Sequence, residues 1–198
     1  MPFRRAGPPT LRLAGDPVAN TLLATNPLAL VIGMVLDQQV PLERAFAAPA
    51  ELARRLGRDL DAAALATMDP EAFSEAFTRT PALHRYPGSM AARVQAICRV
   101  VADEHDGDAA RLWDGAEDGR VLRRRLQSLP GFGEQKARIF LALLAKQFGV
   151  IPPGWREASA PYGEPGSFRS VADIVDDDSL VKVREFKQAA KQRAKQTA

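Results

Sequence analysis

The feature that most constrains this 198-residue chain is a tight, glycine-containing turn between two helical patterns, within residues 126–149. After the turn, apolar residues recur at the spacing of one helix face, and a shorter helical pattern ending near Ser128 precedes it. Elsewhere the alternating pattern that is typical of strands is nearly missing. The sequence therefore predicts an all-α protein that contains this helix–turn–helix unit.

The turn itself has the composition of an anion-binding site. Gly131 and Gly133 permit positive φ and let another surface approach the backbone closely. The amides of Phe132, Gly133 and Glu134 would then lie at the open N-terminus of the next helix, where unpaired N–H groups attract a phosphate. Lys136 adds positive charge, whereas the carboxylate of Glu134 would repel the same phosphate. An ordinary turn without a ligand is the alternative.

The residues of this unit resemble a known DNA-binding motif. The sequence LPGFGEQKA, from Leu129 to Ala137, is followed by an apolar helix and by Phe148 and Gly149. It is similar to the helix-hairpin-helix of the HhH-GPD superfamily of base-excision DNA glycosylases, with Lys136 in place of the family's Thr. Hairpins of this type also occur in nucleases, ligases and polymerases.

The resemblance implies two helical lobes with a DNA-binding cleft between them and the hairpin, residues 126–149, at the mouth of the cleft. Lobe one would span about 27–130, and lobe two about 1–26 together with 134–198. The implied partner is double-stranded DNA that contains a damaged base, bound by a monomer. The residues expected to bind this DNA are Gly131, Phe132, Gly133, Lys136, Gln38 and Gln39.

Composition excludes several classes of protein. The single cysteine, Cys98, excludes a disulfide framework and a four-cysteine iron–sulfur cluster, so no cofactor of that kind is expected. A run of about 18 apolar residues is missing and no signal peptide is visible, which predicts a cytoplasmic, nucleoid-associated protein without a membrane partner. The formal net charge of +3 is compatible with nucleic acid.

A second informative stretch begins with residues 28–36, which are apolar on every side and predict a buried central helix. Asp37, Gln38 and Gln39 follow, and Pro41 either stops the helix or starts the next one at its first turn. The 3-methyladenine branch of the same superfamily has a similar pair of glutamines after an apolar helix. The resemblance implies that Gln39 enters the duplex where a base has been flipped out, with Gln38 as a structural residue. Alternatively, both amides cap neighbouring helix ends.

The residues after the hairpin bear on the chemistry. In the family, a lysine two residues past the second hairpin glycine marks enzymes that also cut the DNA backbone through a Schiff base. That position here is Gln135, so the sequence predicts a monofunctional enzyme without β-lyase activity. At the spacing where the family carries its catalytic aspartate, this chain has Pro153. Glu157, Asp173 and Asp37 compete for the role, and a chain without any catalytic carboxylate is the remaining alternative.

Turn-rich residues 152–169 contain three aromatic side chains, Trp155, Tyr162 and Phe168. Because a flipped base is commonly held between aromatic faces, Trp155 and Tyr162 are candidates for the wall of a base pocket. Simple packing between lobes is the alternative. After Ser179 the chain is rich in Lys and Arg, which predicts a basic helix able to follow a phosphate backbone.

Two further expectations concern small ligands. In the family, hairpin backbone carbonyls often bind a monovalent cation, and the matching carbonyls here are those of Gln127, Leu129 and Phe132. His84 and His105 lack the spacing of metal ligands, so both are expected in loops or on the surface.

Three hypotheses of function follow. The first is a monofunctional DNA glycosylase that hydrolyses the N-glycosidic bond of a flipped, damaged base. The second is a non-enzymatic protein that binds damaged DNA with the same fold and lacks the catalytic carboxylate. The third is a structural helical protein whose hairpin contacts a protein partner.

Overall fold

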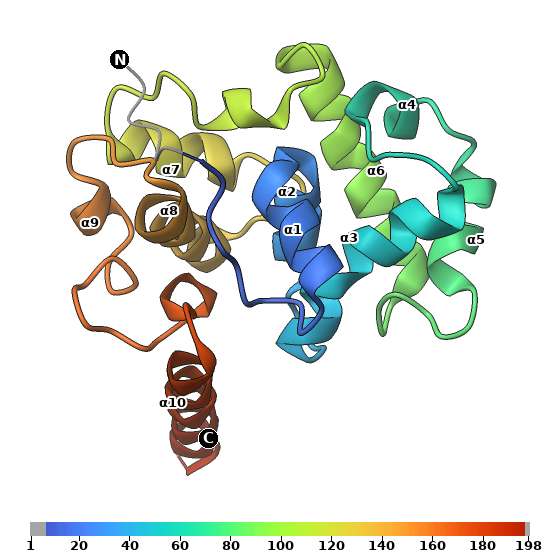
Figure 1. The fold of residues 1–198 in the computed structure, drawn as a ribbon. Coiled ribbons are helices and arrows are strands. Elements are labelled where there is room, and N and C mark those ends of the chain that lie inside the picture. Colours follow the sequence, from blue (N-terminus) through green and yellow to red (C-terminus); the bar gives the residue numbers. More distant parts are fainter. Residues whose placement is uncertain (1–6, 197–198) are drawn as a thin grey trace.

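Residues 7–196 are described by the computed structural model, and their regular structure is entirely helical (Figure 1). The predicted all-α class is therefore confirmed for this part of the chain. Its α-helices are α1 (Pro17–Thr25), α2 (Pro27–Leu36), α3 (Leu42–Leu56), α4 (Ala62–Ala66), α5 (Pro70–Thr78), α6 (Pro87–Glu104), α7 (Gly119–Gln127), α8 (Glu134–Phe148), α9 (Trp155–Ala158) and α10 (Asp177–Gln196). Two 3-10 helices complete it, η1 (Ala109–Leu112) and η2 (Val171–Asp173).

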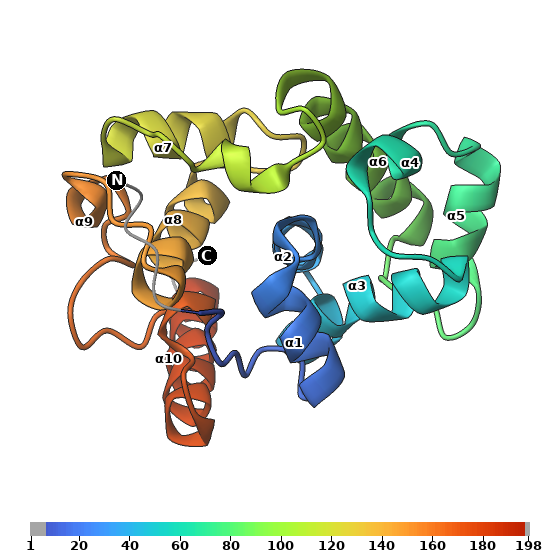
Figure 2. The same ribbon diagram turned by 45° about the horizontal axis from the view of Figure 1, so that its top comes forward.

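Helix α2 lies at the centre of the molecule, with α3–α6 on one side and α7–α9 on the other in both views (Figures 1 and 2). Every residue from Leu28 to Leu36 is buried, as the uniformly apolar pattern predicts. Asn26 caps the helix by accepting a first-turn N–H, and Pro27 occupies the first position. Gly33 lets α3 approach closely, since a Cβ there would lie 2.8 Å from the Phe46 ring. Helix α2 is thus a fixed support for the residues that follow it.

Helices α7 and α8 form the helix–turn–helix unit that the sequence predicts. Asp118 caps α7 by accepting the Val121 N–H at 2.8 Å, and α8 ends at Gly149, whose φ of 73° is left-handed. Helix α7 packs against both α8 and α9. At its start, a Cβ on Gly119 would lie 2.6 Å from the Trp155 Cα, so only glycine fits. Both arms of the hairpin are therefore anchored.

Helix α3 differs from what its proline predicts. Pro49 on its own indicates a helix start, whereas the helix already begins at Leu42 and carries Pro49 in its interior. The reason is tertiary, because one face of α3 buries Ala45, Phe46 and Leu52 against the core. The free energy gained by burying this face outweighs the cost of the helix hydrogen bond that Pro49, which has no backbone N–H, cannot donate.

Helix α10 extends away from the rest of the molecule (Figures 1 and 2). It starts after Asp176, whose side chain accepts the Ser179 N–H at 2.8 Å. Arg184 of α10 is paired with Glu43 of α3, so the middle of α10 lies beside the first turn of α3. Within residues 7–196, no single helix is both long enough and apolar enough to cross a membrane.

Candidate nucleic-acid interface

The hairpin turn, residues 128–133, uses its two glycines in different ways. Gly131 has a φ of 82°, in the left-handed region that favours glycine. A Cβ at this position would also collide with Arg93 and lie 3.0 Å from Val35 Cγ2. Gly133 has a φ of −74°, which any residue adopts. The expectation of positive φ at both glycines is therefore wrong for Gly133, and the fold itself requires glycine only at Gly131.

Gly133 is the outward-facing glycine of the turn. A Cβ on it would meet no atom within 4 Å in the described part of the chain. As the N-cap of α8 it offers no side-chain hydrogen bond, so the first-turn amides of α8 are open to an acceptor from outside. Amides arranged in this way suit a phosphate.

Phe132 and Glu134 have different roles at this anion site from those that the sequence predicts. The Phe132 amide donates to the Leu129 carbonyl at 3.0 Å, so it is not an open donor. Its ring is buried, with its centroid 5.7 Å from that of Phe140, and belongs to the core. The Glu134 carboxylate accepts from Arg138 at 2.6 Å, which compensates part of its negative charge. The open donors are the amides at the start of α8.

Lys136 fastens the hairpin to α2. Its ammonium donates to the Val35 carbonyl at 2.8 Å, in the last turn of α2, where a cation is favourable. Burial lowers the pKa of Lys136 to about 8, with Asp37 opposing the shift and Arg93 adding to it. The structure thus places Lys136 between the hairpin and α2 rather than on the outer surface of the turn.

Asp37 is the half-buried residue that ends α2. Burial raises the pKa of its carboxyl, while Lys187 of α10 and Lys136 of α8 counteract the shift. Helices α8 and α10 therefore both bring a cation to the end of α2. A carboxylate held out of water in this way is suited to act as a base or to stabilise a developing positive charge.

The two glutamines after Asp37 have separate environments. Gln38 is half-buried, and its side-chain amide lies 3.1 Å from the Met90 sulfur. Gln39 is exposed and has a φ of 55°, which is uncommon for a residue other than glycine. Strained backbone of this kind persists only where its surroundings fix it, and it concentrates at functional sites. We refer to Asp37, Gln38 and Gln39 as the corner.

His84 and Tyr86 lie beside the corner, and the sequence did not indicate that either residue belongs to the site. His84 is only 1% exposed, so the expectation of a loop or surface histidine is wrong in respect of burial. Its Nε2 lies 2.9 Å from the Gln38 carbonyl oxygen, so this nitrogen of the buried ring has a hydrogen-bond partner. Tyr86, at 46% exposure, presents its ring to solvent with the Arg85 guanidinium 5.5 Å from the ring centroid. The one sequence signal for Tyr86 is the following Pro87, which opens α6.

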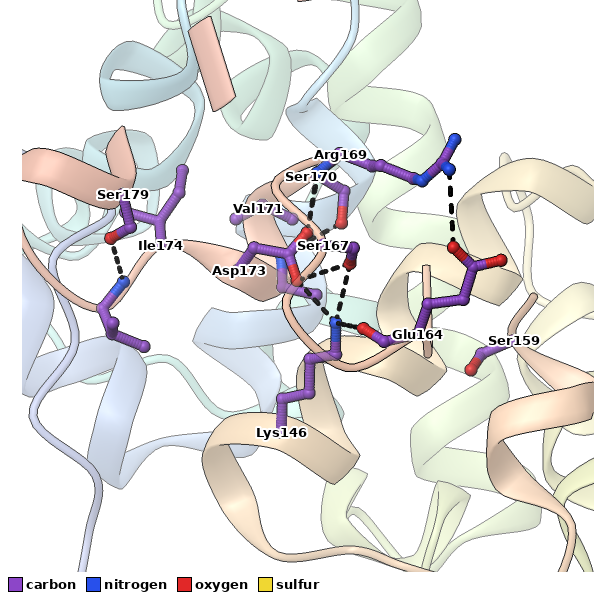
Figure 3. A network of polar contacts seen from close by, with 12 residues as sticks. Lys146, Ser159, Glu164, Ser167, Arg169, Ser170, Val171, Asp173, Ile174 and Ser179 are labelled. Atoms are coloured by element: carbon purple, nitrogen blue, oxygen red, sulfur yellow. Dashed lines mark hydrogen bonds and ion pairs between the residues drawn. The ribbon is translucent and has the colours of Figure 1, made fainter. Parts of the chain in front are cut away.

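Asp173 lies elsewhere, in a closed polar network (Figure 3). One carboxylate oxygen accepts from Lys146 at 2.5 Å and from Ser167 at 3.1 Å. The other accepts the backbone N–H groups of Arg169 and Ser170 at 2.9 and 3.1 Å. Asp173 therefore holds the segment before α10 against α8, and both of its oxygens are engaged.

Glu157 and the aromatic candidates are also distributed away from the corner. Glu157 is exposed on α9, which packs beside the start of α7. Trp155 packs there as well, with Arg156 stacked 4.5 Å from its ring centroid. Tyr162 does reach the hairpin, because its hydroxyl accepts from Gln135 at 2.9 Å. Of the two base-pocket candidates, Tyr162 bonds to the first turn of α8, whereas Trp155 packs at the start of α7.

Two further features of the structure concern small ligands. In residues 7–196, no group of three His, Cys, Asp or Glu side chains is placed to hold a metal ion. The carbonyl site for a monovalent cation at Gln127, Leu129 and Phe132 stays a prediction. A cavity of about 860 Å³ lies at the opposite end of α2, near Pro27 and Trp113, and none of the predicted site residues lines it.

Comparison with known proteins adds no relative. No protein-family model matches the chain, and no curated protein matches it. The geometry alone therefore defines the candidate site: the hairpin turn, Lys136, the corner, His84 and Tyr86, gathered at the C-terminal end of α2.

Proposed function

We propose that this chain is a monofunctional DNA glycosylase that hydrolyses the N-glycosidic bond of a damaged base flipped out of duplex DNA. One observation carries the proposal: a hairpin with open amides, a strained exposed corner and a half-buried carboxylate meet at the end of α2. Lys136, bonded to Val35 at 2.8 Å, joins the hairpin to the helix that ends at Asp37.

Phosphate contacts would come from two elements. The amides at the start of α8 offer donors to one phosphate, and the absence of a side chain on Gly133 allows its close approach. Helix α10 offers Lys182, Lys187 and Lys191 on exposed positions, and Lys187 acts on the Asp37 carboxyl, which ties α10 to the same end of α2. Duplex binding should therefore weaken steeply as salt is raised.

Opening of the duplex would use Gln39 and Tyr86. Both are exposed, and Tyr86 offers an aromatic face on which an unpaired base can stack. The gap left by a flipped nucleotide costs a few kcal/mol unless something fills it. Tyr86 and Gln38, the residue before Gln39, both bond to His84 through their backbones, so the side chains of Gln39 and Tyr86 are suited to fill it.

The chemistry requires a carboxylate near the sugar, and Asp37 is the best placed of the three candidates. As the bond between C1′ and the base nitrogen breaks, Asp37 would stabilise the positive charge on the sugar and accept a proton from the attacking water. The water oxygen forms the new bond to C1′, the base leaves with the electrons of the broken bond, and the proton taken up by Asp37 is then passed to the released base. Lys136 would hold the Asp37 carboxylate in place.

Single-turnover base release tests the proposal. The substrates are duplexes that carry alkylated purines, uracil, oxidised purines or oxidised pyrimidines, with Glu157→Gln as the matched carboxylate control. We expect release of one base class by the wild type and by Glu157→Gln, and a loss of about 100-fold or more in Asp37→Asn. Full activity in Asp37→Asn would remove Asp37 from the mechanism, and release of no base by the wild type would exclude glycosylase activity on these lesions.

The second candidate is a non-enzymatic protein that binds damaged DNA. Its specific support is that Pro153 stands at the spacing of the family's aspartate and that Asp173 is fully engaged with Lys146, Ser167 and backbone amides. Tight, lesion-dependent binding without any base release would favour this candidate over the first.

A further inference from the structure

We propose that His84 is a positioning residue: its neutral imidazole ties the corner to Tyr86, and protonation of the ring releases this tie. The inference rests on the proposed function only in that the corner and Tyr86 are the elements that would enter the duplex. The tie itself is a property of the free protein.

The imidazole makes one hydrogen bond in each direction. Its Nδ1 accepts the Tyr86 backbone N–H at 3.0 Å, so this nitrogen carries no proton. Its Nε2 lies 2.9 Å from the Gln38 carbonyl oxygen, which can only accept, so Nε2 carries the proton and donates it. Only the neutral ring in this one tautomer makes both bonds.

Protonation is incompatible with this arrangement. A second ring proton on Nδ1 would face the Tyr86 N–H, so that bond is lost and two donors repel each other. Burial lowers the pKa of His84, and the positive charges of Arg44 on α3 and Lys136 on α8 lower it further, whereas the backbone carbonyls of Gln38 and Leu36 oppose the shift. Acid therefore acts directly on the bond between His84 and Tyr86.

The rest of the loop is held independently. The buried Arg55 side chain donates to the carbonyls of Ala76, Arg79 and Pro81 at 2.8, 2.9 and 2.7 Å. The loop before His84 is therefore anchored to α3, and we expect the change on protonation to be confined to the corner and to Tyr86. The left-handed backbone of Gln39, which depends on fixed surroundings, is the part most sensitive to such a change.

The first measurement needs no DNA. The imidazole ¹⁵N shifts and the backbone amide shifts of the full chain are followed by NMR from about pH 5 to about pH 8. We expect a bare Nδ1 on His84 at neutral pH and one protonation that shifts the amides of Gln39 and Tyr86 together. His105→Gln removes the other histidine and should leave this titration unchanged, whereas His84→Gln should abolish it.

The second measurement links the tie to DNA. Affinity for a duplex with an abasic-site analogue is measured over the same pH range at constant salt, with circular dichroism at each pH as a folding control. We expect the wild type to lose about tenfold in affinity at the acid end, since a buried hydrogen bond is lost. His84→Gln retains one donor and one acceptor, so it should bind without this pH dependence, and His84→Ala should bind weakly at every pH.

Failure of this inference and failure of the proposed function would give different results. A protonated Nδ1 at neutral pH, or a His84 titration that leaves Gln39 and Tyr86 unmoved, would overturn the inference. A pH dependence that persists in His84→Gln would also overturn it. Duplex binding absent at every pH would count against the proposed function, while the NMR result would still decide whether His84 ties the corner to Tyr86.

Discussion

The ammonium of Lys136 lies 2.8 Å from the carbonyl oxygen of Val35, a residue 101 positions earlier in the chain. This contact brings the second hairpin helix to the end of α2, where Asp37 follows. A local motif and a carboxylate from a distant segment thereby share one corner of the molecule. The consequences can be tested at several positions.

The two hairpin glycines should respond differently to alanine. Gly131→Ala places a Cβ against Arg93 on backbone with positive φ, so we expect a loss of about 2 kcal/mol or more in the free energy of unfolding. Gly133→Ala meets open space at an ordinary φ and should cost about 1 kcal/mol or less. Urea denaturation of both variants measures the difference.

Gly133→Ala should nevertheless weaken duplex binding about tenfold, because its methyl group occupies the space through which a phosphate reaches the amides. Fluorescence anisotropy with a labelled duplex measures this. Wild-type affinity in a folded Gly133→Ala protein would show that DNA does not approach the turn at this point.

Lys136 should affect how the free energy of unfolding depends on pH in the alkaline range. Its folded pKa of about 8 lies below the ordinary 10.5, so between these values the unfolded chain binds more protons than the folded one. The free energy of unfolding should therefore rise with pH across this window in the wild type, relative to Lys136→Met. Urea denaturation at several pH values checks the slope. Lys191→Met, at an exposed position on α10, should keep the wild-type slope.

Borohydride trapping should yield no covalent complex with abasic DNA. Gln135, which faces Tyr162, cannot form an imine, and the Lys136 amine is engaged with the Val35 carbonyl. Gel electrophoresis after reduction provides the measurement. Trapped complexes that vanish in Lys136→Met would identify Lys136 as a nucleophile and replace the monofunctional assignment.

Asp173 should matter for stability. Asp173→Asn leaves the Lys146 ammonium, a partly buried cation, without its carboxylate, so we expect a loss of about 3 kcal/mol in the free energy of unfolding. Asp177→Asn, at a carboxylate that is 89% exposed and 3.7 Å from Arg12, should cost less than about 1 kcal/mol. Thermal and urea denaturation distinguish the two. Equal, small losses would mean that the network in Figure 3 adds little.

The sequence predicted the elements whose signals are local. The hairpin follows from Pro130 and the two glycines between periodic apolar residues, and α2 follows from its uniform hydrophobicity and its Asn26 cap. Both depend on residues a few positions apart, which is the range over which propensity and capping act. Pro49 shows the limit, since tertiary burial of α3 overrides a local helix-breaking signal.

The assembly of the site could not be predicted in this way. Asp37 was one of three competing carboxylates, and it is the cations that Lys136 of α8 and Lys187 of α10 bring to the end of α2 that separate it from Glu157 and Asp173. His84 stands in a polar, turn-rich sequence, yet it is buried, with its two ring nitrogens hydrogen-bonded to the Gln38 carbonyl and the Tyr86 amide. Neither contact has a sequence pattern of its own.

The complete burial of α2 determines which partner in the proposed complex must deform. A helix whose residues are buried from Leu28 to Leu36 cannot shift when a duplex arrives, so α2 acts as a rigid support for the corner that follows it. The DNA would then have to bend, and the free energy of this bending depends on how firmly its bases are stacked. Such a protein would select nucleotides by how easily the surrounding DNA duplex bends, before a pocket recognises the base itself.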